Sequence, residues 1–242
     1  MLALIFTLAA LVPARADPPP VTEPIPYFER HRPAFFLIGK PITKVQISFK
    51  IQPIRKLPLS FGYSQLMLWD LFAPSSPFRD INFAPEVFYS LPLALDVGLE
   101  HESNGKGGEE SRSWNRAYVR YSEHAVVEDG RIGWSAKLML PYGMTDAGSR
   151  RLPERRGLWE IELHASNLFD QVFEVNELIL RIYGGGHTRI NPIHGGQELT
   201  YREKVSERAL LLPLYLQIFH GYGENLLDAD EERWGLRVGV GF

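Results

Sequence analysis

A histidine and a serine two positions apart, His101 and Ser103, are the side chains of this chain best suited to hydrolytic chemistry. They end a stretch in which every second residue is apolar, namely Leu93, Leu95, Val97 and Leu99. Residues two apart on a strand point to the same side and lie roughly 7 Å apart, so their side chains can meet. Serine is a weak nucleophile until a neighbouring imidazole takes its proton. The spacing therefore predicts a Ser-His pair on one face of a strand.

Asn115 is the third residue of this predicted group. It is in phase with the apolar residues Ala117, Val119 and Tyr121. The intervening segment is short enough to make its strand the antiparallel neighbour of the first, which places Asn115 beside His101. An amide can accept a hydrogen bond from the imidazole and orient it, but it cannot offset the imidazolium charge as a carboxylate does. A further electrostatic aid to the oxyanion is therefore expected.

The elements that must position these side chains are strands. Period-two alternation with turn signals every ten to fifteen residues or so predicts about twelve of them. The expected ranges are 34–39, 43–54, 58–72, 81–90, 92–103, 113–126, 131–142, 157–167, 172–183, 196–205, 210–222 and 233–242.

The connections between these strands tend to alternate between short and long. Short ones are expected at 90–92, 128–130 and 167–170, and long ones at 73–80, 104–112, 143–156, 184–195 and 224–232. Bacterial outer-membrane barrels have an even number of strands, short periplasmic turns and longer external loops. Residues 34–242 are therefore expected to form an all-β fold, a single antiparallel transmembrane β-barrel of about twelve strands, with the Leu93 row facing lipid.

The N-terminal region is expected to lie outside this barrel. Residues 1–16 form a short apolar run that ends in an A-x-A site, which is typical of a signal peptide. Residues 17–33 are rich in proline and are expected to be extended. No later apolar run is long enough for a membrane helix. A membrane protein without such a helix must be a closed barrel.

Composition narrows the classes of function. The chain has 242 residues, a net charge of −3 and no cysteine. The charge argues against nucleic acid as a partner, because phosphate binding needs a basic surface. The lack of cysteine excludes a disulfide scaffold and any cysteine-based zinc site.

Several motifs resemble those of the outer-membrane phospholipase A family. The strongest are HESNG at 101–105 and SRSWNR at 111–116. SSPFR at 75–79, YSQ at 63–65 and the closing segment 221–242 are also similar. The resemblance implies a twelve-stranded outer-membrane barrel that degrades lipid. It would be a carboxylic ester hydrolase with phospholipase A1 and A2 activity on phospholipids and lysophospholipids.

The resemblance also implies roles for individual residues. Ser103 would be the nucleophile, His101 the base and Asn115 the orienting residue. The backbone N–H of Gly105 and a calcium-bound water would hold the oxyanion. In an active homodimer, calcium would be held by the Lys106 carbonyl and the Ser111 hydroxyl, with Ser75 reaching the ion from the second subunit. Gln65 would lie at the dimer interface.

Two rival hypotheses share parts of this pattern. A non-enzymatic outer-membrane barrel, either a small pore or a structural protein, would have every barrel feature without a working His101, Ser103 and Asn115. A secreted, calcium-binding β-sandwich lectin would present polar residues on its outward faces. The apolar row that begins at Leu93 argues against the lectin.

Overall fold

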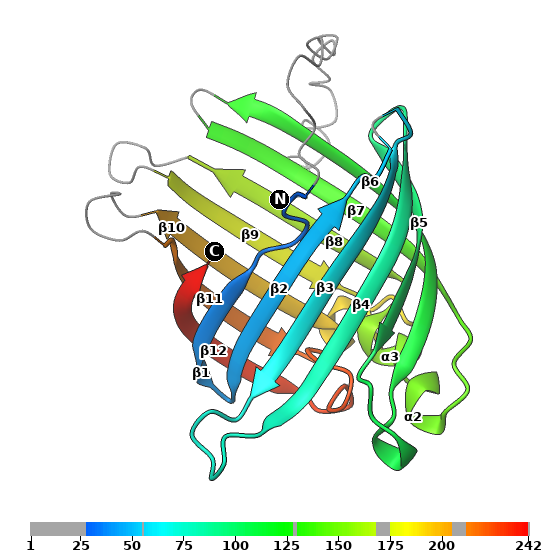
Figure 1. The fold of residues 1–242 in the computed structure, drawn as a ribbon, viewed down its shortest axis with the longest axis vertical. Coiled ribbons are helices and arrows are strands. Elements are labelled where there is room, and N and C mark those ends of the chain that lie inside the picture. Colours follow the sequence, from blue (N-terminus) through cyan, green and yellow to red (C-terminus); the bar gives the residue numbers. More distant parts are fainter. Residues whose placement is uncertain (1–27, 55, 128–129, 168–174, 205–211, 242) are drawn as a thin grey trace.

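Strict alternation of apolar and polar residues produces strands with one apolar and one polar face, and these strands form a closed barrel (Figure 1). The computed structural model describes residues 28–54, 56–127, 130–167, 175–204 and 212–241. Each strand pairs antiparallel with its neighbours in the chain, and β1 pairs with β12 to close the sheet. The strands are β1 (Phe35–Lys40), β2 (Thr43–Ile51), β3 (Leu59–Trp69), β4 (Phe78–Leu91), β5 (Leu95–Ser103), β6 (Ser113–Val127), β7 (Gly130–Tyr142), β8 (Trp159–Ser166), β9 (Val175–Tyr183), β10 (Gly196–Lys204), β11 (Leu214–Gly221) and β12 (Arg233–Gly241).

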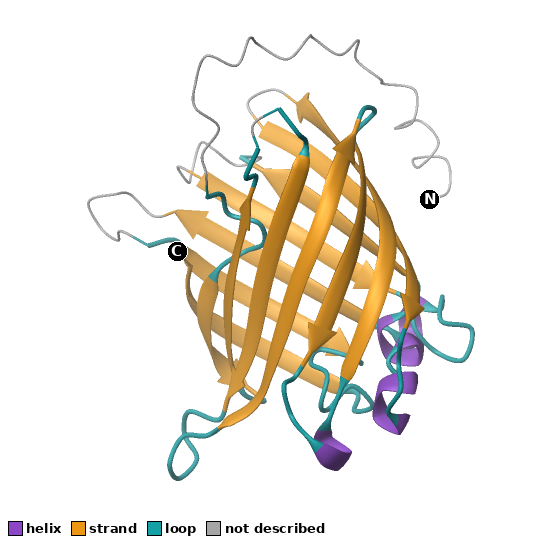
Figure 2. Cartoon of the chain, turned by 45° about the vertical axis from the view of Figure 1, so that its right-hand side comes forward, coloured by secondary structure: helices purple, strands orange, loops and turns teal. Residues whose placement is uncertain are grey.

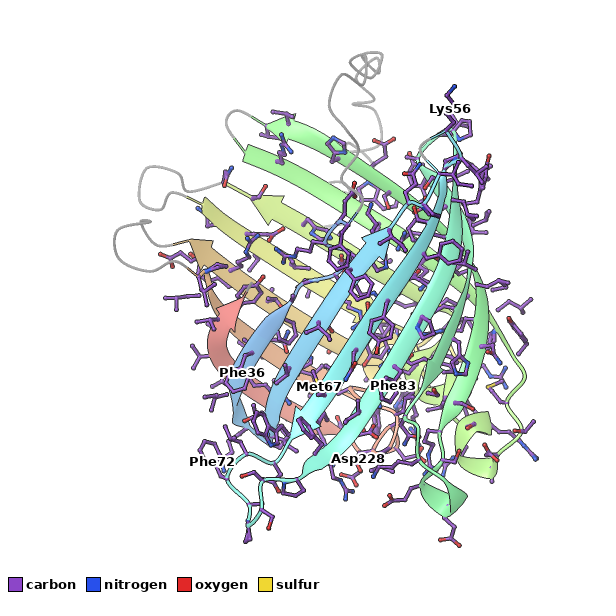
Figure 3. All side chains as sticks on the ribbon, viewed as in Figure 1. Phe36, Lys56, Met67, Phe72, Phe83 and Asp228 are labelled. Carbon is purple, nitrogen blue, oxygen red and sulfur yellow. The ribbon has the colours of Figure 1, made fainter. Side chains whose placement is uncertain are left out.

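The outer wall of the barrel is apolar. Leu99 on β5 is 50% exposed, Leu140 on β7 is 70% exposed and Val238 on β12 is 60% exposed. Phe36, Met67 and Phe83 lie on three further strands of the barrel (Figure 3). So much exposed hydrocarbon on a closed sheet is suited to lipid and not to water. Within the described residues, no helix has both the length and the apolar character needed to cross a membrane.

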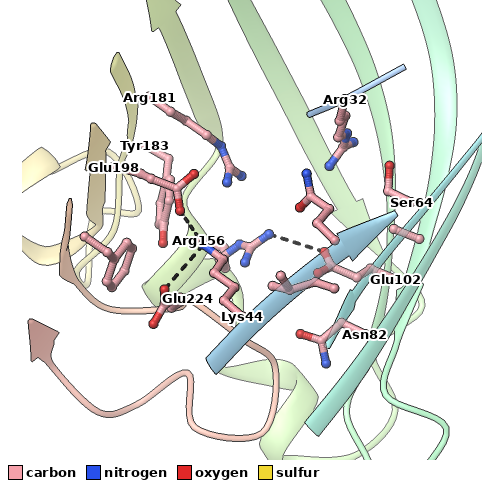
Figure 4. Close-up of a pocket in the computed structure, with 14 residues that line it drawn as sticks. Arg32, Lys44, Ser64, Asn82, Glu102, Arg156, Arg181, Tyr183, Glu198 and Glu224 are labelled. Atoms are coloured by element: carbon pink, nitrogen blue, oxygen red, sulfur yellow. Dashed lines mark hydrogen bonds and ion pairs between the residues drawn. The ribbon is translucent and has the colours of Figure 1, made fainter. Parts of the chain in front are cut away.

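The inner wall is polar and charged. Glu100 is 2% exposed and lies within ion-pair distance of three cations. These are Arg32 at 2.9 Å, Arg116 at 3.0 Å and Lys137 at 2.6 Å. Further round the barrel, Lys44, Glu198 and Glu224 form a second group in the lumen (Figure 4). The inward charges are therefore paired, as buried charges must be.

The described end of the proline-rich segment, residues 28–33, enters the barrel. Glu29 forms an isolated β-bridge with Lys50. His31 Nε2 lies 2.6 Å from the Glu86 carboxylate, and Arg32 contacts both Glu86 and Glu100. Sequence periodicity did not predict this docking, because the contacts of His31 and Arg32 join residues more than fifty positions apart. Residues 1–27, which include the expected signal peptide, lie outside the described residues.

In the described part of the chain, the short helices lie at one end of the barrel, in the loops that follow β5, β7 and β9 (Figure 2). These helices are η2 (Gly108–Glu110), α2 (Ala147–Arg150), α3 (Pro153–Arg156) and η3 (Pro192–His194). A small apolar cluster of Trp114, Leu152, Leu226 and Ala229 packs beneath them. The expected alternation of loop lengths has one exception at this end, since only Pro41 and Ile42 separate β1 from β2.

Strand boundaries differ from the expected ones mainly at turns. The strand expected to begin at residue 92 begins at Leu95, because Leu93 and Ala94 have positive φ of 66° and 57° and form the turn. Leu93 therefore lies in the turn and is not part of the strand row. The expected short connections at 128–130 and 167–170 fall mostly outside the described residues, as does Phe242.

Replacing Glu100 by glutamine tests the interior ion pairs. Glu100→Gln keeps the shape but leaves Arg32, Arg116 and Lys137 without their shared carboxylate. We expect the free energy of unfolding to fall by about 3–5 kcal/mol, the usual cost of breaking a buried ion pair. Urea unfolding of the refolded protein in lipid vesicles measures it.

The matched control is Glu29→Gln. Its partner Lys50 lies 3.0 Å away, but both side chains are about a third exposed. An exposed pair contributes about 1 kcal/mol or less. Equal losses in the two variants would contradict the structural role of the Glu100 cluster.

Candidate active site

His101 and Asn115 are brought together by the pairing of β5 with β6. The register places His101 directly opposite Asn115 and Ser103 opposite Ser113. His101 Nδ1 lies 2.9 Å from Asn115 Oδ1, a hydrogen-bonding distance. All three predicted residues lie on the outward face, in line with Leu99. The predicted neighbourhood of His101 and Asn115 is therefore present at the protein surface and not in an internal pocket.

The His101–Asn115 hydrogen bond determines which ring nitrogen is free. An amide oxygen can only accept, so Nδ1 must carry the proton in this pair. The neutral ring then has its lone pair on Nε2, where a base for the Ser103 hydroxyl is needed. Within the described part of the chain, Ser103 makes no hydrogen bond to His101. Apo structures commonly show this last contact loose.

Asn115 is held from its other side by the end of β7. Its Nδ2 lies 3.5 Å from the Tyr142 carbonyl oxygen. Gly143, with φ of 68°, follows so closely that an added Cβ would lie 2.8 Å from the same nitrogen. Ser149 in α2, fully buried, accepts a hydrogen bond from the Ser113 N–H at 2.9 Å. The loop after β7 thus packs against the strand that carries Asn115.

The loop between Ser103 and Ser113 carries the predicted oxyanion and calcium residues. Gly105 is exposed, with φ of 65°. Lys106 and Ser111 lie in the same loop, and the Lys106 ammonium donates to Glu110 at 2.8 Å. This hydrogen bond lowers the pKa of Glu110 below its ordinary value. Glu110 therefore adds a stable negative charge to the loop.

The other two predicted residues lie on or beside β3. Ser75 is exposed in the loop between β3 and β4 and has φ of 63°. Gln65 lies in β3, where its Oε1 accepts a hydrogen bond from the Tyr63 hydroxyl at 2.7 Å. Gln65 pairs across the sheet with Ile47 and Phe83. It is thus a polar side chain on an apolar wall.

Beneath the site, inward side chains support the two strands. Glu102 is buried, as expected from its phase, and its carboxylate accepts from the Arg116 guanidinium at 2.7 Å and the Trp114 indole at 3.1 Å. Arg156 reaches Glu102 from α3 at 3.5 Å (Figure 4). The alternation of the strand predicts Glu102 inside but gives no sign of Asn104, which is 4% exposed at the base of the loop between Ser103 and Ser113. The Asn-Gly pair at 104–105 is a turn signal that could have drawn attention to it.

Comparison with known proteins shows the family and supports the fold. The family model described as phospholipase A1 matches residues 28–242. The chain belongs to the phospholipase A1 family. With the closed barrel and its apolar outer wall, this membership places the chain in the bacterial outer membrane.

Among relatives in the phospholipase A1 family, the chain is 27% identical over 226 residues to a putative phospholipase A1 of Neisseria meningitidis, covering 83% of this chain and 54% of that protein. It is 29% identical over 195 residues to phospholipase A1 of Escherichia coli, covering 76% of this chain and 61% of that protein. The chain thus spans less than two thirds of the length of these relatives.

Solved structures of outer-membrane phospholipases share the fold. The one from Escherichia coli superposes with a TM-score of 0.71 at 23% identity, covering 89% of this chain and 98% of that one. A dimer with bound calcium from Salmonella typhi superposes with a TM-score of 0.72 at 22% identity, covering 89% of this chain and 92% of that one. The predicted all-β barrel of twelve strands is confirmed.

Replacing Gly143 by alanine tests how Asn115 is held. The added Cβ would push against the Asn115 amide, and φ of 68° disfavours alanine. A displaced Asn115 would no longer hold the His101 ring in place, and small displacements of a base slow a reaction strongly. We therefore expect Ser103 to react with a fluorophosphonate about 10- to 100-fold more slowly. Stopped-time labelling without added metal measures the rate.

The control for this experiment is Gly107→Ala. An added Cβ there meets nothing within 4 Å, and φ is −107°. Unchanged labelling of the Gly143 variant, or an equal loss in both, would contradict the role given to the Gly143 contact.

Proposed function

We propose that this protein is a phospholipase that hydrolyses acyl esters of phospholipids and lysophospholipids, with A1 and A2 activity, in the outer membrane. The observation that carries the proposal is the His101–Asn115 hydrogen bond at 2.9 Å, with Ser103 next in line on the lipid-facing row. A nucleophile on the outer wall can be reached by a lipid from within the bilayer. A water-soluble substrate would be better served by a site in a cleft.

In the proposed mechanism, Ser103 Oγ attacks the ester carbonyl carbon while His101 Nε2 takes its proton. The tetrahedral intermediate collapses as the imidazolium returns this proton to the leaving alcohol, which departs as the lysolipid. Water then attacks the acyl-enzyme, with His101 again as base, and releases the fatty acid. Asn115 keeps the ring in the productive tautomer throughout. The Gly105 N–H is the proposed donor to the oxyanion.

Calcium is the proposed cofactor. The loop fits a hard cation, because it offers the Lys106 carbonyl, the Ser111 hydroxyl and a nearby acidic pair, Glu109 and Glu110. Among the described residues, no three His, Cys, Asp or Glu side chains gather as a metal site. Calcium takes about six to eight oxygen ligands, so the Lys106 carbonyl and the Ser111 hydroxyl would need further partners. When bound, the ion would supply the positive charge near the oxyanion that Asn115 cannot provide.

A homodimer would complete the calcium site in this proposal. Ser75 is the ligand assigned to the second subunit, and it protrudes at the same end of the barrel as the Lys106 loop. Gln65 is assigned to the interface within the membrane, where a polar side chain on an apolar wall gains by pairing with a second copy. The solved structure from Salmonella typhi, a dimer with bound calcium, supports the proposal of a calcium-binding homodimer.

A pore is the less suitable alternative. Charged side chains in ion pairs, with Arg32 among them, occupy the lumen (Figure 4). An aqueous channel needs a lumen that water and solute can pass. The lumen of this barrel is instead crossed by ion pairs.

The decisive variant for the proposed function is Ser103→Ala. We expect it to lower hydrolysis of phosphatidylcholine by detergent-refolded protein with calcium by at least about a thousandfold, because the nucleophile is gone. Fatty-acid release measures the rate. Ser122→Ala, an exposed serine on the adjacent strand, serves as control and should match the wild type. Equal hydrolysis by the Ser103 variant and the wild type would favour the non-enzymatic barrel.

Ser111→Ala tests the calcium assignment. We expect the calcium concentration for half-maximal activity to rise about tenfold, the usual effect of disturbing a metal ligand sphere. Dimer content, measured by sedimentation at fixed calcium, should fall in parallel. Glu109→Gln removes a loop charge without removing the proposed ligand and should shift the calcium response less. If a chelator changes neither activity nor dimer content, Ser75, Lys106 and Ser111 are not metal ligands.

A further inference from the structure

Asn104, the residue after the proposed nucleophile, lies under the loop that carries the oxyanion and calcium residues. Ser103 points outward, so Asn104 points inward, and it is 4% exposed. Its amide makes four hydrogen bonds. The oxygen accepts from Arg112 N at 3.0 Å and from Lys106 N at 3.4 Å, and the nitrogen donates to the Glu110 carbonyl at 2.9 Å and to Asp80 at 3.3 Å. One buried side chain therefore holds both ends of the loop.

These hydrogen bonds determine the direction of the Gly105 backbone. Asn104 N donates to the Arg112 carbonyl at 3.0 Å, as in a strand pair. Arg112 N, however, donates to the Asn104 side-chain oxygen and not to the Asn104 backbone carbonyl. The Asn104 side chain thus takes the place of the next backbone hydrogen bond of the sheet. The chain turns at Gly105, which has φ of 65°. Within the described residues the Gly105 N–H makes no backbone hydrogen bond. Gly105 is exposed and lies two residues after Ser103 in the chain.

Asp80 anchors Asn104 to the barrel. It lies in β4, is 1% exposed, and accepts from Asn104 Nδ2, from Asn82 Nδ2 at 2.6 Å and from the Leu227 N–H at 3.0 Å. On the outer side, the Phe83 ring lies beneath Gly105, 3.2 Å from where a Cβ would be. The loop is therefore fixed from inside by a carboxylate and from outside by an aromatic ring. Neither Asp80 nor Asn104 is exposed enough to touch a substrate.

We infer that Asn104, anchored by Asp80, is a positioning residue that aims the Gly105 N–H at the oxyanion and the Lys106 carbonyl at the metal. This inference rests on the proposed function, since it assigns the means by which that site is held in shape. Asn104 acts through the two neighbouring backbone groups, and His101 and Asn115 do not depend on it. Its loss should therefore lower kcat and calcium affinity while leaving KM and the pH profile close to those of the wild type.

The first test is Asn104→Ala in refolded full-length protein. We expect kcat for phosphatidylcholine to fall about 100-fold, the usual cost of a misplaced oxyanion donor. KM should change less than about threefold, and calcium affinity by titration calorimetry should fall about tenfold. The control is Asn225→Ala, a buried amide at 1% exposed whose oxygen accepts a hydrogen bond within its own loop, from Asp228 N at 2.9 Å. This control should lose stability but keep its kcat.

A second test separates positioning from folding. Asn104→Asp places a carboxylate against Asp80 and should lower kcat as the alanine variant does. In the double variant Asp80→Asn with Asn104→Asp, the two partners exchange and an amide can again donate to a carboxylate. We expect kcat at least about tenfold above that of Asn104→Asp. If Asn104→Ala does not fold, this comparison decides alone.

The outcomes are distinct for the inference and for the proposed function. Suppose that Ser103→Ala abolishes hydrolysis but Asn104→Ala keeps the wild-type kcat and calcium affinity. This result overturns the inference and leaves the proposed function standing. So does a double variant no more active than Asn104→Asp, or an Asn225→Ala variant with the same loss of kcat. Activity that survives Ser103→Ala overturns the proposed function, and the inference with it.

Discussion

Every backbone N–H and C=O group that lies within hydrocarbon must be hydrogen bonded inside the protein, because lipid offers no partner. The pairing of β1 with β12 satisfies this requirement by removing the last two free edges of the sheet. Closure fixes which face of each strand meets lipid, and alternation along the strand then assigns every side chain to lipid or lumen. The position of the candidate site follows directly, since its residues lie where the outward row of β5 reaches the end of the sheet.

The site uses the wall of the barrel as its platform. In a site of this kind, two neighbouring strands provide the rigid spacing, and the loops at their ends provide further polar groups. His101 and Asn115 depend on strand register alone. Gly105, Lys106 and Ser111 depend on a loop whose shape comes from buried side chains such as Asn104. The two halves of the site therefore have different structural origins, although they are adjacent in sequence.

This difference explains how much the sequence alone could predict. Period-two alternation located all twelve strands and the faces of His101, Ser103, Glu102 and Asn115, because the side-chain direction of a strand is a local property. Turns were less accessible, since positive φ at Leu93 and Ala94 contradicts the usual preference of these residues. The pairs His31–Glu86 and Asn104–Asp80 were not accessible at all. They join residues 55 and 24 positions apart, and periodicity carries no information on such contacts. The roles of Ser75, Lys106, Ser111 and Gln65 remain predictions drawn from resemblance.

Arg32 has a mechanical consequence. A tube made of hydrogen-bonded strands can flatten in cross-section with little change to any single hydrogen bond. Arg32 precedes β1 and contacts Glu86 on β4 and Glu100 on β5, so it forms a brace across the lumen from the region of β1 to the strand that carries His101. Such a brace resists flattening under the lateral pressure of a bilayer. The cross-section of the barrel at this level is thereby kept independent of the changing lipid around it.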